Sequence, residues 1–187
     1  MSLALYFPCL LGMQCDGFTI IAADQTNLQS IVLMKNGDDN RFTSCNKKLK
    51  KITLQFTALI CFRYNLNTVS TVHFARNSLA EILRSNTPSL ISMLIGGYDT
   101  ESGAELYTMD FLGSSVKVPF GSFGFGGIFS LGIMDECYRP SLTVFEAYEV
   151  LKLCVKEIQT RLFVNLPSFQ VKVVSKEGIQ ALPIITH

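Results

Sequence analysis

Short apolar runs separated by turn residues open the chain. The first two runs, Cys9–Met13 and Phe18–Ala23, flank Asp16-Gly17, a dipeptide typical of the tight turn between antiparallel strands. A third run, Ser30–Met34, follows after a few polar residues. The pattern therefore predicts a β-hairpin and then a third strand, with Asp24 at the end of the second strand.

The central part of the chain repeats this strand pattern. Two further runs, Ser92–Asp99 and Glu105–Gly113, flank a turn-rich segment and predict a hairpin whose loop is longer than two residues. Within the first of these runs, Gly96 and Gly97 predict a bulge or a close approach of another backbone. The glycines of Gly121–Gly127 predict a tight turn in front of the next apolar segment.

Apolar residues at helical spacing predict three helices. The first covers Val69–Arg84 and has one apolar face, and the second covers Ile128–Tyr138. The third runs to about Leu162 and begins at Thr143, because Thr143 and Glu146 have the spacing of a capping box.

The C-terminal part returns to strands. Phe169–Val174 alternates like a half-buried strand, and Ile179–Leu182 is expected to pair back on it. Pro183–His187 is an apolar tail with no evident local partner, and we expect this tail to contact a neighbouring chain. Leu54–Asn65 mixes strand and helix signals. Groups of strands that alternate with helices fit an α+β domain of stacked sheets with helices outside.

Composition narrows the class of protein. The 187 residues suffice for one domain with a sizeable core. The net charge of +1 at pH 7 indicates neither nucleic acid nor an acidic membrane as partner. Hydrophobic residues make up 48% and charged residues 17% of the chain, and the mean hydropathy is +0.31. This apolar surplus either fills a large core or covers surfaces that face partner chains, and we favour the second interpretation.

The remaining compositional features indicate an intracellular protein. No segment is long and apolar enough to cross a bilayer, and Met1–Cys15 lacks the basic start of a signal peptide. The six cysteines contain no CxxC pair and are interpreted as reduced, mostly buried thiols. The basic cluster Lys47–Lys51 is interpreted as a solvated loop or strand edge.

Three sequence elements in the centre of the chain carry a family resemblance. They are a Gly-Gly-x-Asp strand end at Gly96–Asp99, a Leu-Tyr-x-x-Asp-x-x-Gly strand at Leu106–Gly113, and a Gly-x-Gly turn at Gly124–Gly126. In this order they resemble the β-type subunits of the 20S proteasome, and among these the non-catalytic subunits at the fourth ring position. The resemblance is weakest between residues 49 and 67, where the family's usual strand and Gly-x-x-Gly-Asp turn are missing. The chain is either shortened there or lacks residues.

The resemblance implies a fold, partners and a location. The fold is a single domain over residues 1–187, a four-layer αββα sandwich of the N-terminal-nucleophile hydrolase type with two antiparallel sheets between helix layers. The implied partners are other α- and β-type proteasome subunits in stacked heptameric rings, in the cytoplasm and nucleus, where the complex carries out ATP- and ubiquitin-dependent protein degradation. No cofactor, metal, nucleic acid or membrane is implied.

The residues that the family uses for chemistry are replaced here. In catalytic members, the α-amine of an N-terminal threonine activates the hydroxyl of the same residue. Counted back from Asp24, that position is Pro8, which has no hydroxyl, and the family's lysine corresponds to Asn40. The matched positions of the degenerate site are Pro8, Asp24, Asn40, Phe125, Asn165 and Ser168. The resemblance therefore implies a subunit without a catalytic residue of its own.

Two alternatives from other classes stay open at this point. One is an active threonine peptidase of the same fold whose nucleophile lies elsewhere; Ser2 has the wrong spacing to Asp24 for this role. The other is an unrelated soluble binding module. With His73 and His187 as the two histidines, neither a histidine metal site nor a Ser/His/Asp triad is indicated.

Overall fold

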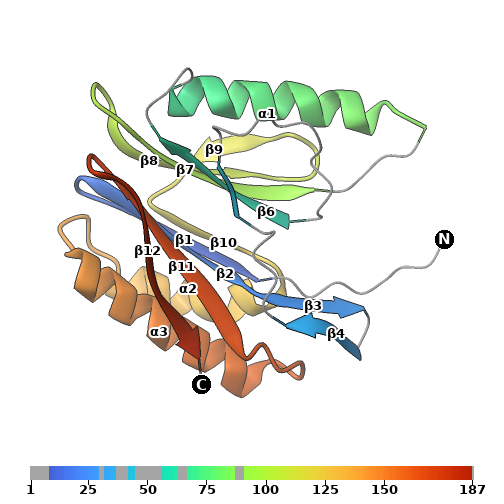
Figure 1. Cartoon of the computed structure of the whole chain (residues 1–187), viewed down its shortest axis with the longest axis vertical. Coiled ribbons are helices and arrows are strands. Elements are labelled where there is room, and N and C mark those ends of the chain that lie inside the picture. Colours follow the sequence, from blue (N-terminus) through green and yellow to red (C-terminus); the bar gives the residue numbers. More distant parts are fainter. Residues whose placement is uncertain are drawn as a thin grey trace.

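The computed structural model describes residues 9–29, 32–36, 42–44, 56–62, 67–86 and 91–186, and the side chains of 9–25, 67–86 and 91–186 (Figure 1). Two β-sheets lie face to face in the middle of the molecule. Helix α1 (Thr68–Leu83) covers the outer face of one sheet, and α2 (Phe125–Cys137) and α3 (Val144–Arg161) cover the outer face of the other. The order of layers is helix, sheet, sheet, helix, so the predicted αββα sandwich is confirmed.

The first sheet is antiparallel throughout. Its order is β10 (Phe120–Phe123), β1 (Leu10–Cys15), β2 (Phe18–Asp24), β11 (Ser168–Ser175) and β12 (Gly178–Thr186). The predicted Asp-Gly turn joins β1 to β2, and Gly17 has the positive φ of 84° that such turns require.

The second sheet pairs its strands in two ways. Its order is β5 (Phe42–Ser44), β6 (Phe56–Phe62), β7 (Ser92–Asp99), β8 (Gly103–Met109) and β9 (Ser115–Lys117). The strands from β7 to β9 are antiparallel, as expected, whereas β5, β6 and β7 run parallel. The parallel pairing follows from the connection, because α1 carries the chain from β6 back to the start of β7. The ambiguous segment near residue 60 is therefore a strand.

A small two-stranded sheet extends beside the first one. It consists of β3 (Thr26–Gln29) and β4 (Val32–Asn36), which pair antiparallel. The third predicted strand corresponds to β4, although its first residues, 30 and 31, lie outside the described part of the chain. The basic cluster at 47–51 also lies outside it.

Three apolar layers hold the sandwich together. Leu11 and Leu151 belong to the layer between the first sheet and α2 and α3. Leu10 and Leu106 belong to the layer between the two sheets, and Leu79 to the layer under α1. All five side chains are fully buried. The first sheet is thus covered on both faces, which explains why β2 is buried along its whole length.

Gly96 and Gly97 mark a close approach and no bulge. The register between β7 and β8 runs through both residues without a shift. A Cβ on Gly96 would lie 2.8 Å from Ile21 Cδ1 on the facing sheet, and a Cβ on Gly97 would lie 2.3 Å from Thr68 Oγ1 on α1. The two glycines therefore let β7 approach the sheet on one side and the helix on the other.

The starts of α1 and α3 agree with the sequence pattern, and the start of α2 differs from it. Asn67 caps α1 by accepting a hydrogen bond from the Ser70 N–H at 2.7 Å. The predicted capping box of α3 is present between Thr143 and Glu146. Helix α2 begins at Phe125, earlier than the predicted Ile128, because the chain leaves its turn at Gly124 with φ at 90°.

The apolar tail has a partner within the chain, although the sequence indicated none; its expected contact with a neighbouring chain stays a prediction. Strand β12 continues through Pro183, and Ile185 and Thr186 pair with Phe169 and Ser168 of β11. A register shift between Phe169 and Val171 accommodates the longer strand. Proline has no backbone N–H to donate. Because β12 is the last described strand of its sheet, Pro183 can be accommodated without the loss of a hydrogen bond between strands.

Candidate functional site

The predicted site lies where four elements meet: the start of β1, the end of β2, the start of β11 and the start of α2. Asp24 pairs with Phe169 across the sheet, and the Gln25 N–H donates to the Ser168 carbonyl at 3.0 Å. A Cβ on Gly126 would lie 2.9 Å from the sulfur of Cys9, the residue before β1. The fold thus brings Asp24, Ser168 and the first turn of α2 together around Cys9.

Asp24 is bound to the backbone at the start of β1. Its carboxylate accepts a hydrogen bond from the Cys9 N–H at 2.5 Å, and its own N–H donates to the Cys9 carbonyl at 3.1 Å. The side chain is 1% exposed. A carboxylate at this depth requires donors, and a backbone N–H is a strong one. Asp24 therefore fixes the residue that follows Pro8, the position matched to the nucleophile.

The space around Cys9 is filled. Cys9 is fully buried, and Gly126 approaches it so closely that a Cβ there would also lie 2.9 Å from Ile158 Cγ2 of α3. Sequence reasoning treated Cys9 as one of several buried thiols and missed its place in the site. The signal was available, since Cys9 directly follows Pro8.

The other matched positions differ in how close they lie to Asp24 and in how exposed they are. Phe125, the first residue of α2, is 48% exposed. Asn165 is exposed in the connection between α3 and β11, and Ser168 is the first residue of β11. Pro8, Asn40 and also Ser2 lie outside the described residues.

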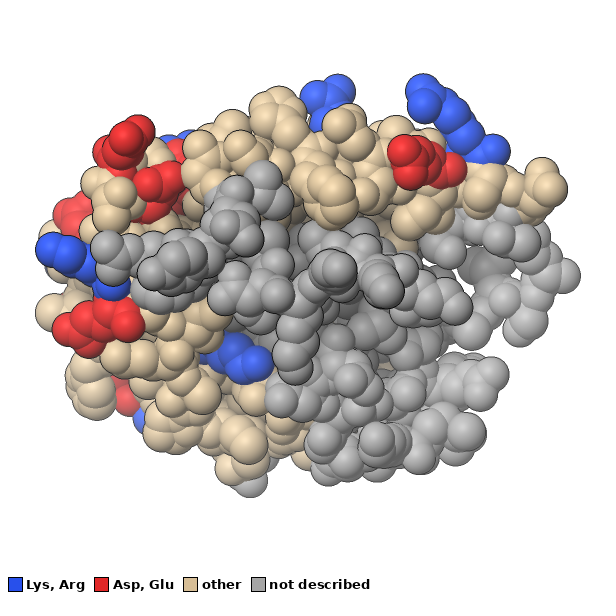
Figure 2. Space-filling view, turned by 45° about the horizontal axis from the view of Figure 1, so that its top comes forward, with Lys and Arg blue, Asp and Glu red and all other residues tan. Residues whose placement is uncertain are grey.

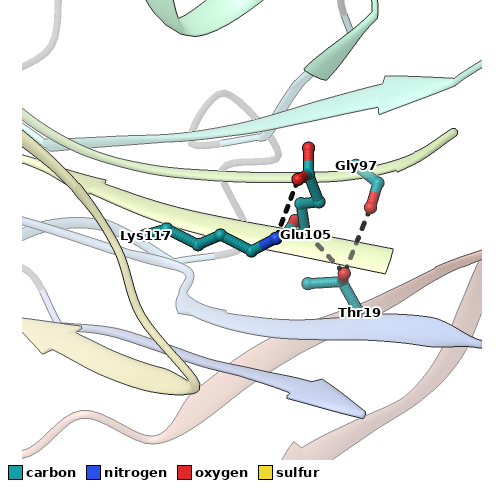
Figure 3. A network of polar contacts seen from close by, with 4 residues as sticks. All are labelled: Thr19, Gly97, Glu105 and Lys117. Carbon is teal, nitrogen blue, oxygen red and sulfur yellow. Dashed lines mark hydrogen bonds and ion pairs between the residues drawn. The ribbon is translucent and has the colours of Figure 1, made fainter. Parts of the chain in front are cut away.

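A second polar cluster joins the two sheets (Figure 3). The Thr19 hydroxyl of β2 lies 3.3 Å from the Gly97 carbonyl and 3.4 Å from the Glu105 carbonyl, to which it can donate in turn. On β9, Lys117 places its Nζ 2.8 Å from Glu105 Oε1. Thr19 is fully buried and donates to carbonyl oxygens, so this cluster is a structural tie between sheets and does not activate a nucleophile.

The ion pair of this cluster gives a testable dependence on pH. The hydrogen bond from Lys117 to Glu105 is the main cause that raises the pKa of Lys117 above its usual 10.5. A raised lysine pKa stabilises the fold below the unfolded pKa, and this stabilisation is lost as the pH rises through the folded pKa. We expect the melting temperatures of the protein and Lys117→Met to differ near neutral pH and to converge above pH 10.5. The difference should be small, because the Lys117 side chain is 48% exposed.

Thermal unfolding followed by circular dichroism at several pH values measures this convergence. Burial raises the pKa of Tyr107 in the same cluster, whereas the charge of Lys117 lowers it, so both proteins are compared in a Tyr107→Phe background, from which this titration is absent. A gap between the two melting temperatures that widens with rising pH would contradict the assignment of the ion pair.

Two buried thiols outside the site, those of Cys15 and Cys154, are unreactive. Burial, with a smaller contribution from Asp16, raises the pKa of Cys15 to about 11. Burial also raises the pKa of Cys154 to about 12. Both thiols stay protonated at neutral pH and are poor nucleophiles. Within the described residues, no group of His, Cys, Asp and Glu could hold a metal ion, and His73 is exposed on α1.

On one face of the molecule, the charged side chains of the described residues show no preference for one sign. On the face shown in Figure 2, basic and acidic side chains of the described residues lie among each other and form no single basic patch. This agrees with the balanced net charge and gives no indication of a nucleic-acid surface. Among the described helices, none has the length and apolarity to cross a bilayer.

Comparison with known proteins identifies the family. Residues 55–174 match the family model described as "Proteasome subunit". The chain belongs to the proteasome subunit family. The match covers more than half of the chain and includes α1, both later helices and the strands from β6 to most of β11. The alternative of an unrelated binding module is thereby wrong.

Relatives place this family member among the β-type subunits. It is 39% identical to proteasome subunit beta type-2-A of Arabidopsis thaliana, over 91% of this chain and 90% of the relative. It is 33% identical to proteasome subunit beta type-2 of Dictyostelium discoideum, over 93% of this chain and 96% of the relative. With proteasome subunit beta type-4 of Saccharomyces cerevisiae the identity is 31%, over 91% of this chain and 94% of the relative. The resemblance to β-type proteasome subunits is confirmed.

Proposed function

We propose that this proteasome subunit is non-catalytic and acts as a structural member of the 20S core particle. One observation carries the proposal: the Asp24 carboxylate binds the backbone N–H of Cys9, directly after Pro8 at the position matched to the catalytic threonine. Proline supplies no hydroxyl, and the Asp24 carboxylate is engaged in holding the strand. The neighbouring thiol of Cys9 is fully buried, which argues against a substitute nucleophile.

The proposed role of the subunit is to make the contacts that close the ring. In a closed ring, each subunit presents two different surfaces to its two neighbours. Large apolar side chains are exposed on the described surface, which supports extensive contact with other chains. They include Leu112 (68% exposed), Ile128 (69%), Phe145 (71%) and Leu153 (51%). We propose heptameric β-rings stacked with α-rings, this chain at the fourth β position, and a location in the cytoplasm and nucleus.

Purification under native conditions tests the assembly. A tagged chain should elute as part of a particle many times larger than its own 20.8 kDa, together with other α- and β-type subunits identified by mass spectrometry. Elution as a stable monomer would contradict the proposal.

Substitution of Asp24 tests the structural role of the carboxylate. Asp24→Ala leaves the buried Cys9 N–H without its acceptor and should lower the free energy of unfolding by about 1–3 kcal/mol. Asp24→Asn keeps an acceptor oxygen and should be less destabilising. Denaturant unfolding of the two variants measures the difference. If instead assembled particles carrying Asp24→Asn kept their stability and lost a peptidase activity of this chain, the carboxylate would have a catalytic role.

A further inference from the structure

A groove runs between α3 and β12. Its volume is about 330 Å³, and its lining residues are Tyr148, Lys152, Val155, Lys156, Gln159, Ile184, Ile185 and Thr186. The floor is apolar, because Val155 is 1% and Ile185 6% exposed. Ile184 at the rim is 49% exposed. The groove therefore offers apolar surface beside the last strand of the first sheet.

That strand has an open edge without charged side chains. Within the described part of the chain, β12 pairs with β11 on one side and with no strand on the other. Open edges are normally guarded by charged side chains, proline or a bulge. Strand β12 has nine residues and no charged side chain, and its edge is protected only at Pro183 and at the adjoining register shift opposite Phe169–Val171. An edge of this kind, next to exposed Ile184, is suited to pairing with another extended segment.

The rim of the groove carries an unbalanced positive charge. Lys152 is paired with Glu149 at 2.7 Å, and its Nζ lies 4.8 Å from the centre of the Tyr148 ring. Lys156, one helical turn further, is exposed and forms no ion pair with a described residue, and the nearby Glu157 is paired with Arg161. A carboxylate placed over the groove would neutralise Lys156.

Hydrogen bonds of the rim also suit a polypeptide. The Tyr148 hydroxyl donates to the Pro183 carbonyl at 3.2 Å and fixes β12 against α3. Gln159 uses its amide N–H in a bond of 2.9 Å to the Leu166 carbonyl, which leaves its amide oxygen able to accept from a backbone N–H. Lys156 and Gln159 thus provide one donor and one acceptor above an apolar floor.

We propose that this groove binds an extended segment of an adjacent subunit, which adds a strand to the β12 edge beside Ile184–Thr186. One apolar side chain of the segment lies on Val155 and Ile185, and an Asp or Glu carboxylate pairs with Lys156. This inference rests on the proposed function, because it requires an assembled particle.

Zero-length carbodiimide coupling in the native particle tests the pairing. We expect Lys156 to couple to an Asp or Glu of one adjacent subunit, located by mass spectrometry in an extended segment. Lys176, in the turn between β11 and β12, is the control and should not couple to that segment. Coupling of Lys156 to a second copy of this chain, or to no subunit while the particle is intact, would overturn the proposal.

Hydrogen exchange of the same particles tests the strand addition. Amides of Ile184–Thr186 should exchange roughly tenfold or more faster in Lys156→Glu particles than in unmodified ones, as expected for loss of a charge-assisted bond. Lys176→Glu makes the same change of charge and should leave these amides protected. If Lys156→Glu prevents assembly, Lys156→Gln serves in its place. Equal exchange in all intact particles would refute the inference, whereas a chain that never enters a particle would refute the proposed function instead.

Discussion

Phe169→Ala is expected to lower the free energy of unfolding by about 3–5 kcal/mol. Phe169 is fully buried and packs in the apolar layer between the first sheet and α2 and α3. It also pairs with Asp24 on one side and Ile185 on the other. Its removal would leave a cavity directly beside the carboxylate that holds β1 and beside the end of β12.

Denaturant unfolding of the purified chain measures this loss, and Phe145→Ala is the matched control. Phe145 makes the same change of side chain on α3 but is 71% exposed, so its substitution should alter the free energy of unfolding by no more than about 0.5 kcal/mol. Similar effects of the two substitutions would show that the layer under α2 and α3 is not the packed core described above.

Gly97→Ala should destabilise the fold by about 1–3 kcal/mol, the range found for overpacking of a closely packed site. The added Cβ would lie 2.3 Å from Thr68 Oγ1 and 2.9 Å from Thr68 Cγ2. Thr68 is the first residue of α1 and is 2% exposed, so it has little room to move. Either α1 shifts away from β7 or the strand bends.

Thermal unfolding distinguishes this clash from a general effect of replacing glycine. Gly132→Ala in α2 meets nothing within 4 Å and should stabilise the helix by about 0.5–1 kcal/mol. Combining Gly97→Ala with Thr68→Ala removes the two closest atoms and should recover part of the loss. No recovery in the double variant would mean that the close approach of α1 and β7 is wrongly placed.

Local sequence signals were sufficient where the structure depends on neighbouring residues. The Asp16-Gly17 turn needs only a positive φ at the glycine. The capping box of α3 needs only the spacing from Thr143 to Glu146. The three helices and the central hairpin follow in the same way from periodicity and turn residues.

Features that depend on contacts between distant segments could not be read from local patterns. The tail after Leu182 looked unpartnered because its partners, Phe169 and Ser168, lie on the preceding strand beyond a register shift. Likewise, the parallel pairing of β6 with β7 depends on the path of the chain through α1. The mixed strand and helix signals in β6 indicated neither that this segment is a strand nor that it pairs parallel to β7.

The candidate site was located by matched positions, and its bonding was not foreseen. Sequence matching selected Asp24 and Ser168, and the fold places both at the end of the first sheet. No sequence pattern predicts the hydrogen bond from the Cys9 N–H to the Asp24 carboxylate, since it joins a backbone group to a side chain 15 residues further along the chain. Pro8 and Asn40 lie outside the described residues, so their roles remain predictions.

Intact-mass analysis after treatment with an electrophile directed at N-terminal threonine tests the central claim most directly. The native particle that contains this chain is treated, dissociated, and the mass of each subunit is measured. A non-catalytic subunit keeps its mass unchanged while catalytic subunits of the same particle gain the mass of the reagent. Stoichiometric modification of this chain at its own N-terminal residue would contradict the account.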